Sequence, residues 1–229
     1  MATPRQDTGI YASPERWKVL RSDPAFLELV RLARVVNSLA GNYAGLLTPL
    51  DDQSPRARRD RFGAFFYVAA LLQEGLKAAE SLGRYFRDLP QFQTDFGALF
   101  ADPDVRELRS GDLDKIRDQV VFHFDRDCLA VGLSRFPDGR TLIATAPQQW
   151  VSGEVYFDIA DDAVVAYLYA DAPTQPEYLA RVERLMTRVT GVFQRFMQAS
   201  HRLIPAALQR MGCHPEPFAR PAPPSDAAV

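Results

Sequence analysis

Residues 62–82 read FGAFFYVAALLQEGLKAAESL, and the spacing of their apolar side chains decides the fold class. Large apolar residues recur every three or four positions, which is the period of an α-helix with one buried face. Ser54 and Pro55 supply an N-cap and a first-turn proline before this stretch, and Pro90 follows it as a stop signal. The sequence therefore predicts a long central core helix over about 55–88.

Helical patterns of the same kind lie on both sides of this central helix. The sequence predicts an earlier helix over about 24–47 and a final helix over about 174–211, and Pro205 is expected to bend or break the final one. Shorter helices are predicted at 91–101, from 103 to an interruption at Ser110 and Gly111, from a new cap at Asp112, and over 158–170, where a helix is favoured over a strand. The stretch 128–136 fits a helix or a strand.

The remaining segments complete the predicted domain organisation. TLIATA and VSGEVYF have strand-like patterns and predict a small β-hairpin at about 140–157. We therefore expect a mainly α fold, an antiparallel bundle of about five main helices with this hairpin as an insertion, forming a single domain over 23–211. Residues 1–22 are expected to form a flexible N-terminal arm, and the proline-rich residues 212–229 a disordered tail.

Composition excludes several classes of function. The chain of 229 residues is 47% hydrophobic and carries a formal net charge of -2, so no overall basic field would draw it onto nucleic acid or anionic lipid. Its two cysteines, Cys128 and Cys213, have no neighbour at metal-ligand or redox spacing. No signal peptide or membrane span is apparent, and the longest apolar run, 62–72, is short and flanked by charges. We expect a cytoplasmic protein without metal or cofactor.

The stretch LDKIRDQVVFHFD, residues 113–125, carries the candidate catalytic cluster of Arg117, Asp118 and His123. In an α-helix, six positions correspond to about 600° of rotation and about 9 Å of rise, so Arg117 and His123 lie roughly 120° apart. Side-chain reach or a second copy of the helix in a dimer would have to bring them together. An arginine that binds a phosphate oxygen beside a histidine that transfers a proton suits metal-independent cleavage of a phosphodiester.

This cluster resembles the motif of the HEPN superfamily, an arginine followed after four to six residues by a histidine, often with a polar residue directly after the arginine. VVFHFD is similar to the motif helix of abortive-infection-type HEPN-like proteins, and the order of elements over roughly 24–200 also fits. The resemblance implies a homodimeric helical protein, with Arg117, Asp118 and His123 as catalytic residues. Many members are metal-independent ribonucleases of toxin-antitoxin or phage-defence systems, and many others have lost the activity.

The same spacing occurs a second time, at Arg195 and His201. Given the number of arginines and histidines, chance predicts about one such match in this chain. Arg195 is followed by Phe196 instead of a polar residue, so the setting favours the first pair. In the alternative interpretation, His123 is a helix-terminal residue favoured by the helix dipole and Arg117 is a surface or ion-paired side chain.

A basic cluster at the start of the central helix is a second candidate binding site. Four arginines oppose the helix dipole there, and RNA phosphate or an acidic partner would offset this cost; alternatively, nearby aspartates neutralise them locally. The cluster consists of Arg56, Arg58, Arg59 and Arg61.

Three functions remain open from the sequence. The first is a HEPN-like protein that cleaves or binds RNA. The second is a non-catalytic helical module that binds a protein partner, such as an antitoxin, through an apolar face of the last helix or the hairpin. The third is a sensor of a small ligand, which would require an enclosed pocket.

Overall fold

The computed structural model describes residues 7–46, 54–121, 126–136, 144, 158–169, 171–172 and 174–218. Within these ranges the protein is mainly α-helical with one small antiparallel sheet, which confirms the predicted fold class. In chain order, with η denoting π-helical segments, the elements are β1 (Asp7–Tyr11), α1 (Pro14–Leu20), α2 (Pro24–Leu46), α3 (Pro55–Phe86), η1 (Phe92–Gly97), α4 (Ala98–Ala101), α5 (Pro103–Leu108), η2 (Arg109–Leu113), η3 (Ile116–Val121), α6 (Arg126–Leu133), α7 (Asp158–Leu168), α8 (Gln175–Arg210) and β2 (His214–Phe218).

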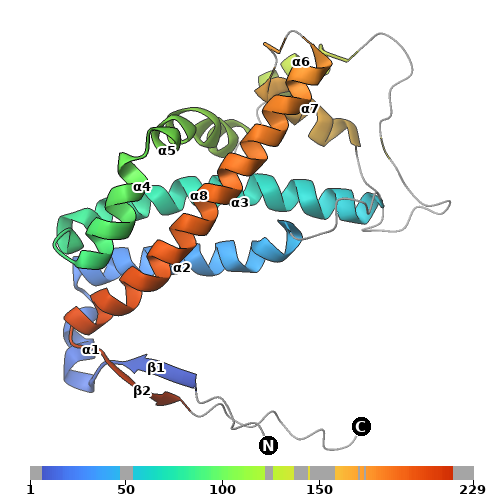
Figure 1. Cartoon of the computed structure of the whole chain (residues 1–229). Helices are drawn as coiled ribbons and strands as arrows, with labels where there is room; N and C mark the ends of the chain where they lie inside the picture. The colour runs from blue at the N-terminus through green and yellow to red at the C-terminus, as the bar shows by residue number, and fades with distance from the viewer. Residues whose placement is uncertain are drawn as a thin grey trace, which may run out of the picture.

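Helices α2 and α3 form an antiparallel pair, and α8 runs across both of them (Figure 1). The segments from η1 to α5 pack against α8, and η1 also packs against α3. Elements of the first half of the chain therefore contact the last helix on several sides. None of the helices in the described ranges is long and apolar enough to cross a membrane.

The predicted start signals are confirmed at the long helices. The Ser54 hydroxyl accepts a hydrogen bond from the Ala57 amide, and the Thr174 hydroxyl accepts one from the Glu177 amide. Each cap satisfies a backbone donor that the first helical turn leaves without a partner. The predicted bounds of α2, α3 and α8 therefore agree with the structure to within about two residues, which is the usual uncertainty of helix ends.

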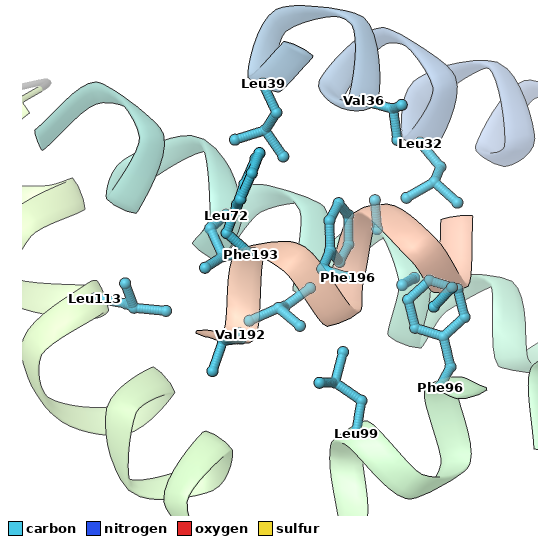
Figure 2. Close-up of a cluster of buried hydrophobic side chains, with 14 of the residues drawn as sticks. Leu32, Val36, Leu39, Leu72, Phe96, Leu99, Leu113, Val192, Phe193 and Phe196 are labelled. Atoms are coloured by element: carbon cyan, nitrogen blue, oxygen red, sulfur yellow. The ribbon is translucent and has the colours of Figure 1, made fainter. Parts of the chain in front are cut away.

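The core lies where α8 crosses α2 and α3 (Figure 2). Phe196 is fully buried there, and its ring lies so close to Gly75 of α3 that a Cβ atom on Gly75 would be 2.5 Å from the ring Cζ. Gly75 thus allows α3 and α8 to approach each other closely. Figure 2 shows side chains from α2, α3, η1, α4 and η2 around this part of α8: Leu32, Val36, Leu39, Leu72, Phe96, Leu99 and Leu113.

The predicted interruption at Ser110 and Gly111 is wrong, and of the two effects expected of Pro205 the break is absent. The chain does not break at Ser110 and Gly111, since η2 continues through both residues, and Asp112 lies inside η2 instead of capping a new helix. A π-helical turn accommodates an extra residue by bonding residue i to i+5, so the helix continues where a break was expected. Pro205 does not break α8 either, which continues to Arg210.

The two ends of the chain pair with each other, which corrects the predicted flexible arm and disordered tail for residues 7–21 and 212–218. β1 and β2 form the two-stranded antiparallel sheet, and Leu20 of α1 is fully buried. Pro215 and Pro217 face Ile10 and Thr8 in the register. Because antiparallel pairs alternate between hydrogen-bonded and non-hydrogen-bonded, these prolines fall on the non-bonded pairs and the strand tolerates them.

The hairpin predicted at about 140–157 lies outside the described residues, apart from Ala144. On either side of it the structure contains α6 and α7, so 128–133 is helical and the preference for a helix after Asp158 is confirmed. The two helices pack closely, since a Cβ atom on Gly132 would be only 1.9 Å from the backbone oxygen of Ala163.

Candidate functional site

Arg117 and Asp118 of the candidate cluster lie in η3, on a π-helical turn packed against α3. A π-helix turns less per residue than an α-helix, so the 120° separation calculated for Arg117 and His123 does not apply to this segment. His123 lies outside the part of the chain that the structure describes. That Arg117 and His123 meet through side-chain reach or through a second copy of the helix therefore stays a prediction.

Two carboxylates hold the Arg117 guanidinium. Its Nε atom lies 2.5 Å from Oε1 of Glu74 on α3, and its Nη1 atom forms an ion pair with Oδ1 of Asp118. The contact with Glu74 is a close ion pair without the alignment of a hydrogen bond. The Arg117 side chain remains 28% exposed. Arg117 is thus ion-paired, which agrees with the interpretation that it is a surface or ion-paired side chain. It is nevertheless still accessible to solvent.

The ion pairs continue from η3 across α3 to α2. Glu74 also lies 3.6 Å from Arg31, and Arg31 lies 3.6 Å from Glu28. We call the set Glu28, Arg31, Glu74, Arg117 and Asp118 the Arg117 network. It contains three carboxylates and two guanidinium groups, so the positive charge of Arg117 is largely compensated.

A second polar group beside the Arg117 network fixes η2 against α3. The buried Gln73 side chain donates hydrogen bonds to Oδ1 of Asp114 at 3.0 Å and to the backbone oxygen of Arg109 at 3.1 Å. Lys77 lies 3.5 Å from the same Asp114 oxygen. The hydrogen bond from Gln73 is the main reason why the pKa of Asp114 is lowered, and the positive charge of Lys77 adds to it.

An open pocket of about 380 Å³ lies over this group. It is lined by Gln73, Asp114, Ser110, Arg106 and Arg109. Arg109 is ion-paired with Glu80 at 2.8 Å, whereas the Arg106 guanidinium donates to the backbone oxygen of Ala101 at 3.3 Å. Two further arginines therefore lie at the surface close to the Arg117 network.

Sequence reasoning missed the α3 side of this site. Gln73 and Glu74 directly follow the longest apolar run of the chain, and Gln73 is only 3% exposed. A buried polar residue inside a core helix requires hydrogen-bonding partners, so this residue could have indicated a polar contact at this position of the helix. The partners themselves, more than 30 residues away along the chain, are fixed only by tertiary packing.

The basic cluster at the start of α3 is described only in part. The side chains of Arg56, Arg58 and Arg59 lie outside the described residues, and Arg61 is partly buried beside Phe62 and Phe65.

The second arginine-histidine pair has a structural explanation. Arg195 lies 2.6 Å from Asp102, and His201 is exposed. The same arrangement repeats along α8, and we call these four pairs the arginine ladder: Arg188 with Glu107, Arg195 with Asp102, Arg202 with Asp95, and Arg210 with Asp88. Three of the arginines are seven residues apart, a repeat that was visible in the sequence and was missed.

No group of three or more potential metal ligands occurs among the described residues. Comparisons with protein-family models, curated proteins and solved structures found no significant match to this chain. The resemblance to the HEPN superfamily consequently stays a prediction.

Proposed function

We propose that the protein binds RNA at the Arg117 edge of the bundle and cleaves it without a metal ion, in the manner of a HEPN-like ribonuclease. The observation that carries this proposal is the partly exposed Arg117 guanidinium, held in place by Glu74 and Asp118. A guanidinium fixed before the substrate arrives loses little side-chain entropy when it binds a phosphate.

The neighbouring charges support binding of a phosphate backbone. Arg106 and Arg109 line the open pocket beside the Arg117 network. Arg109 and Arg117 are paired with carboxylates, whereas Arg106 contacts the backbone oxygen of Ala101, so the positive charge of Arg106 remains available to a phosphate. Contacts to phosphate position a nucleic acid without reading its sequence. We therefore expect affinity for RNA to depend strongly on salt concentration.

In the proposed reaction, Arg117 binds a non-bridging phosphate oxygen, and Asp118 orients the guanidinium. The ribose hydroxyl oxygen forms a bond to phosphorus as the P–O bond to the leaving oxygen breaks. His123 either takes the proton of the attacking hydroxyl or gives one to the leaving oxygen, and water carries the other proton. A toxin-antitoxin or phage-defence role, with an antitoxin as a protein partner, and a homodimeric state belong to the same proposal.

The test is an RNA cleavage assay in the presence of a chelator, with single-stranded and structured RNAs. We expect His123→Ala to lower the cleavage rate by about 100-fold or more, the contribution typical of a general acid or base. Arg117→Gln should also lower it, because a charge-assisted contact to the phosphate is lost. His201→Ala is the matched control, because His201 belongs to the second pair with the same spacing and is exposed. It should cleave like the wild type.

Three results would contradict the proposal: equal rates in all four proteins, activity that disappears when the chelator is added, or a wild type that neither cleaves nor binds RNA. Thermal unfolding of each variant shows whether a loss of activity reflects a loss of fold. If wild type binds RNA without cleaving it, catalysis is excluded while the RNA-binding part of the proposal is retained.

A second candidate is a non-catalytic module that binds a protein partner, and one observation favours it. Trp17 and Val19 of α1 and Leu27 and Val30 of α2 are each about half exposed. On the last helix, the predicted partner surface, most of the apolar face is buried in the core, and Met186 is 38% exposed. If α1 and α2 carry an interface, Leu27→Ser should weaken self-association in light scattering, whereas Val131→Ser on α6 should not.

A further inference from the structure

Two pockets lie side by side along the first half of α8, and none of their lining residues belongs to the Arg117 network. A polar pocket of about 320 Å³ is lined by Asp112, Glu177, Arg181, Arg184 and Arg188. An apolar pocket of about 180 Å³ lies between α3, α7 and α8. Tyr169 and Leu185 line both pockets and form the wall between them. A polar and an apolar compartment are therefore adjacent.

Most of the charges in the polar pocket are already paired. Arg181 lies 2.7 Å from Glu177 and 2.9 Å from Asp171, and Arg188 lies 3.4 Å from Glu107. These contacts neutralise two of the three arginines without a ligand. A simple anion would therefore find little uncompensated positive charge from Arg181 and Arg188.

Arg184 and Asp112 are the exceptions. Within the described ranges, neither side chain forms an ion pair or hydrogen bond. Arg184 is exposed at the rim, and Asp112 is partly buried. The pocket thus presents one guanidinium and one carboxylate without a direct partner among the described residues, although Arg188 and Lys115 act on Asp112 from a greater distance. Together the two groups are complementary to a zwitterion.

The environment of Asp112 suits a cationic ligand group. Burial raises the pKa of its carboxyl above the ordinary value, and the charges of Arg188 and Lys115 only partly oppose this effect. Glu107 adds to the increase. Burial destabilises the charged form of a carboxylate that has no direct partner. An ammonium group placed beside Asp112 would compensate for the hydration that is lost on burial.

The apolar pocket has the size and lining to hold a hydrocarbon or aromatic group. Phe62 and Phe65 of α3 face Val182 and Met186 of α8 across it. Tyr169, in the shared wall, packs edge-on against Tyr178 with ring centroids 6.3 Å apart. Burial of an apolar group here would contribute roughly in proportion to the area removed from water.

We propose that the two pockets together bind a free α-amino acid with a large apolar side chain. Arg184 would bind the carboxylate in a bidentate manner, Asp112 the ammonium group, and the apolar pocket the side chain. This site goes beyond the proposed RNA function and does not depend on it, since none of its residues belongs to the Arg117 network.

The test is isothermal titration calorimetry of the full chain with L-phenylalanine, L-leucine, L-methionine and L-tryptophan. At least one should bind, and analogues of the best ligand should bind at least ten-fold more weakly when one group is missing. For phenylalanine these are phenylacetate, which lacks the ammonium group, phenethylamine, which lacks the carboxylate, and glycine, which lacks the apolar group.

Variants then identify the site. Arg184→Gln and Asp112→Asn should each weaken binding by at least ten-fold, whereas Arg202→Gln, on the same helix but outside both pockets, should leave it unchanged. Circular dichroism confirms that each variant is folded. The proposal is overturned if no amino acid of the panel binds, if phenylacetate binds as tightly as phenylalanine, or if both pocket variants bind like the wild type.

Discussion

Helix α3 contacts its neighbours through apolar atoms on one side and through polar groups on the other. On one side, Gly75 lies against the ring of Phe196, and the contact between α3 and α8 is made by apolar atoms. On the other side, Gln73, Glu74 and Lys77 contact η2 and η3 through hydrogen bonds and ion pairs. The apolar side fixes how the helices cross, and the polar side places Arg117. We therefore expect substitutions on the first side to affect stability and those on the second to affect function.

The largest effect should come from Phe196→Ala. Phe196 is fully buried at the helix crossing, so its removal leaves a cavity surrounded by side chains that relax only partly. We expect a loss of about 3–5 kcal/mol in the free energy of unfolding, measured by urea denaturation. Tyr67→Ala on α3 removes an aromatic side chain that is 45% exposed and should lower stability much less. Similar losses in both variants would show that the crossing is not tightly packed.

Gly75→Ala tests the close approach itself. A Cβ atom at this position would overlap the Phe196 ring, and forcing the two helices apart should lower stability by about 1–3 kcal/mol. Gly63→Ala is the matched control on the same helix, because no atom outside its own turn lies within 4 Å of the added Cβ. Alanine favours the helix there by roughly 1 kcal/mol. The two substitutions should therefore shift the melting temperature in opposite directions, and an increase for both would refute the close contact.

The same contrast explains which features were predictable from the sequence. The bounds of α2, α3 and α8 follow from apolar periodicity and from caps such as Ser54 and Thr174, which are local signals. The pairing of β1 with β2 joins residues about 200 positions apart, and the prolines of β2 read as a disordered tail because their register was unknown.

The candidate site was predictable only in part. Arg117 and Asp118 were identified from their spacing to His123, but Glu74, which fixes Arg117, could be recognised only as a polar residue in an apolar helix. The π-helical form of η2 and η3 also has no simple sequence signal, and it changes which side chains share a face. Side-chain positions in this region depend on packing against α3.

Glu74→Gln tests whether the polar side of α3 serves to position Arg117. The substitution keeps the shape but removes the charge, and because both side chains are about a quarter exposed, we expect a loss of only about 1 kcal/mol in stability. The effect on RNA affinity or cleavage should be larger, several-fold or more, since Arg117 is then held by Asp118 alone. Asp88→Asn, which removes the charge paired with Arg210 and lies on a side chain that is 70% exposed, is the control. Equal losses of RNA affinity or cleavage rate in the two variants would show that Glu74 has no specific role in positioning Arg117.

The smallest effect is expected in the arginine ladder, which lies at the surface next to the core contact of α8. The hydrogen bond from Arg195 is the main reason why the pKa of Asp102 is lowered, and Arg210 acts in the same way on Asp88. A carboxyl whose pKa is lower in the folded state stabilises the protein above its unfolded pKa, and this contribution is lost as the pH falls through the folded value. Arg195→Gln should therefore be slightly less stable than the wild type at pH 7 and equal to it at acidic pH, once Asp102 is protonated in both. Urea denaturation at pH 7 and again below the lowered pKa of Asp102 in the folded protein measures this convergence. A difference that persists unchanged in acid would mean that Arg195 stabilises α8 by packing of its side chain and not by its charge.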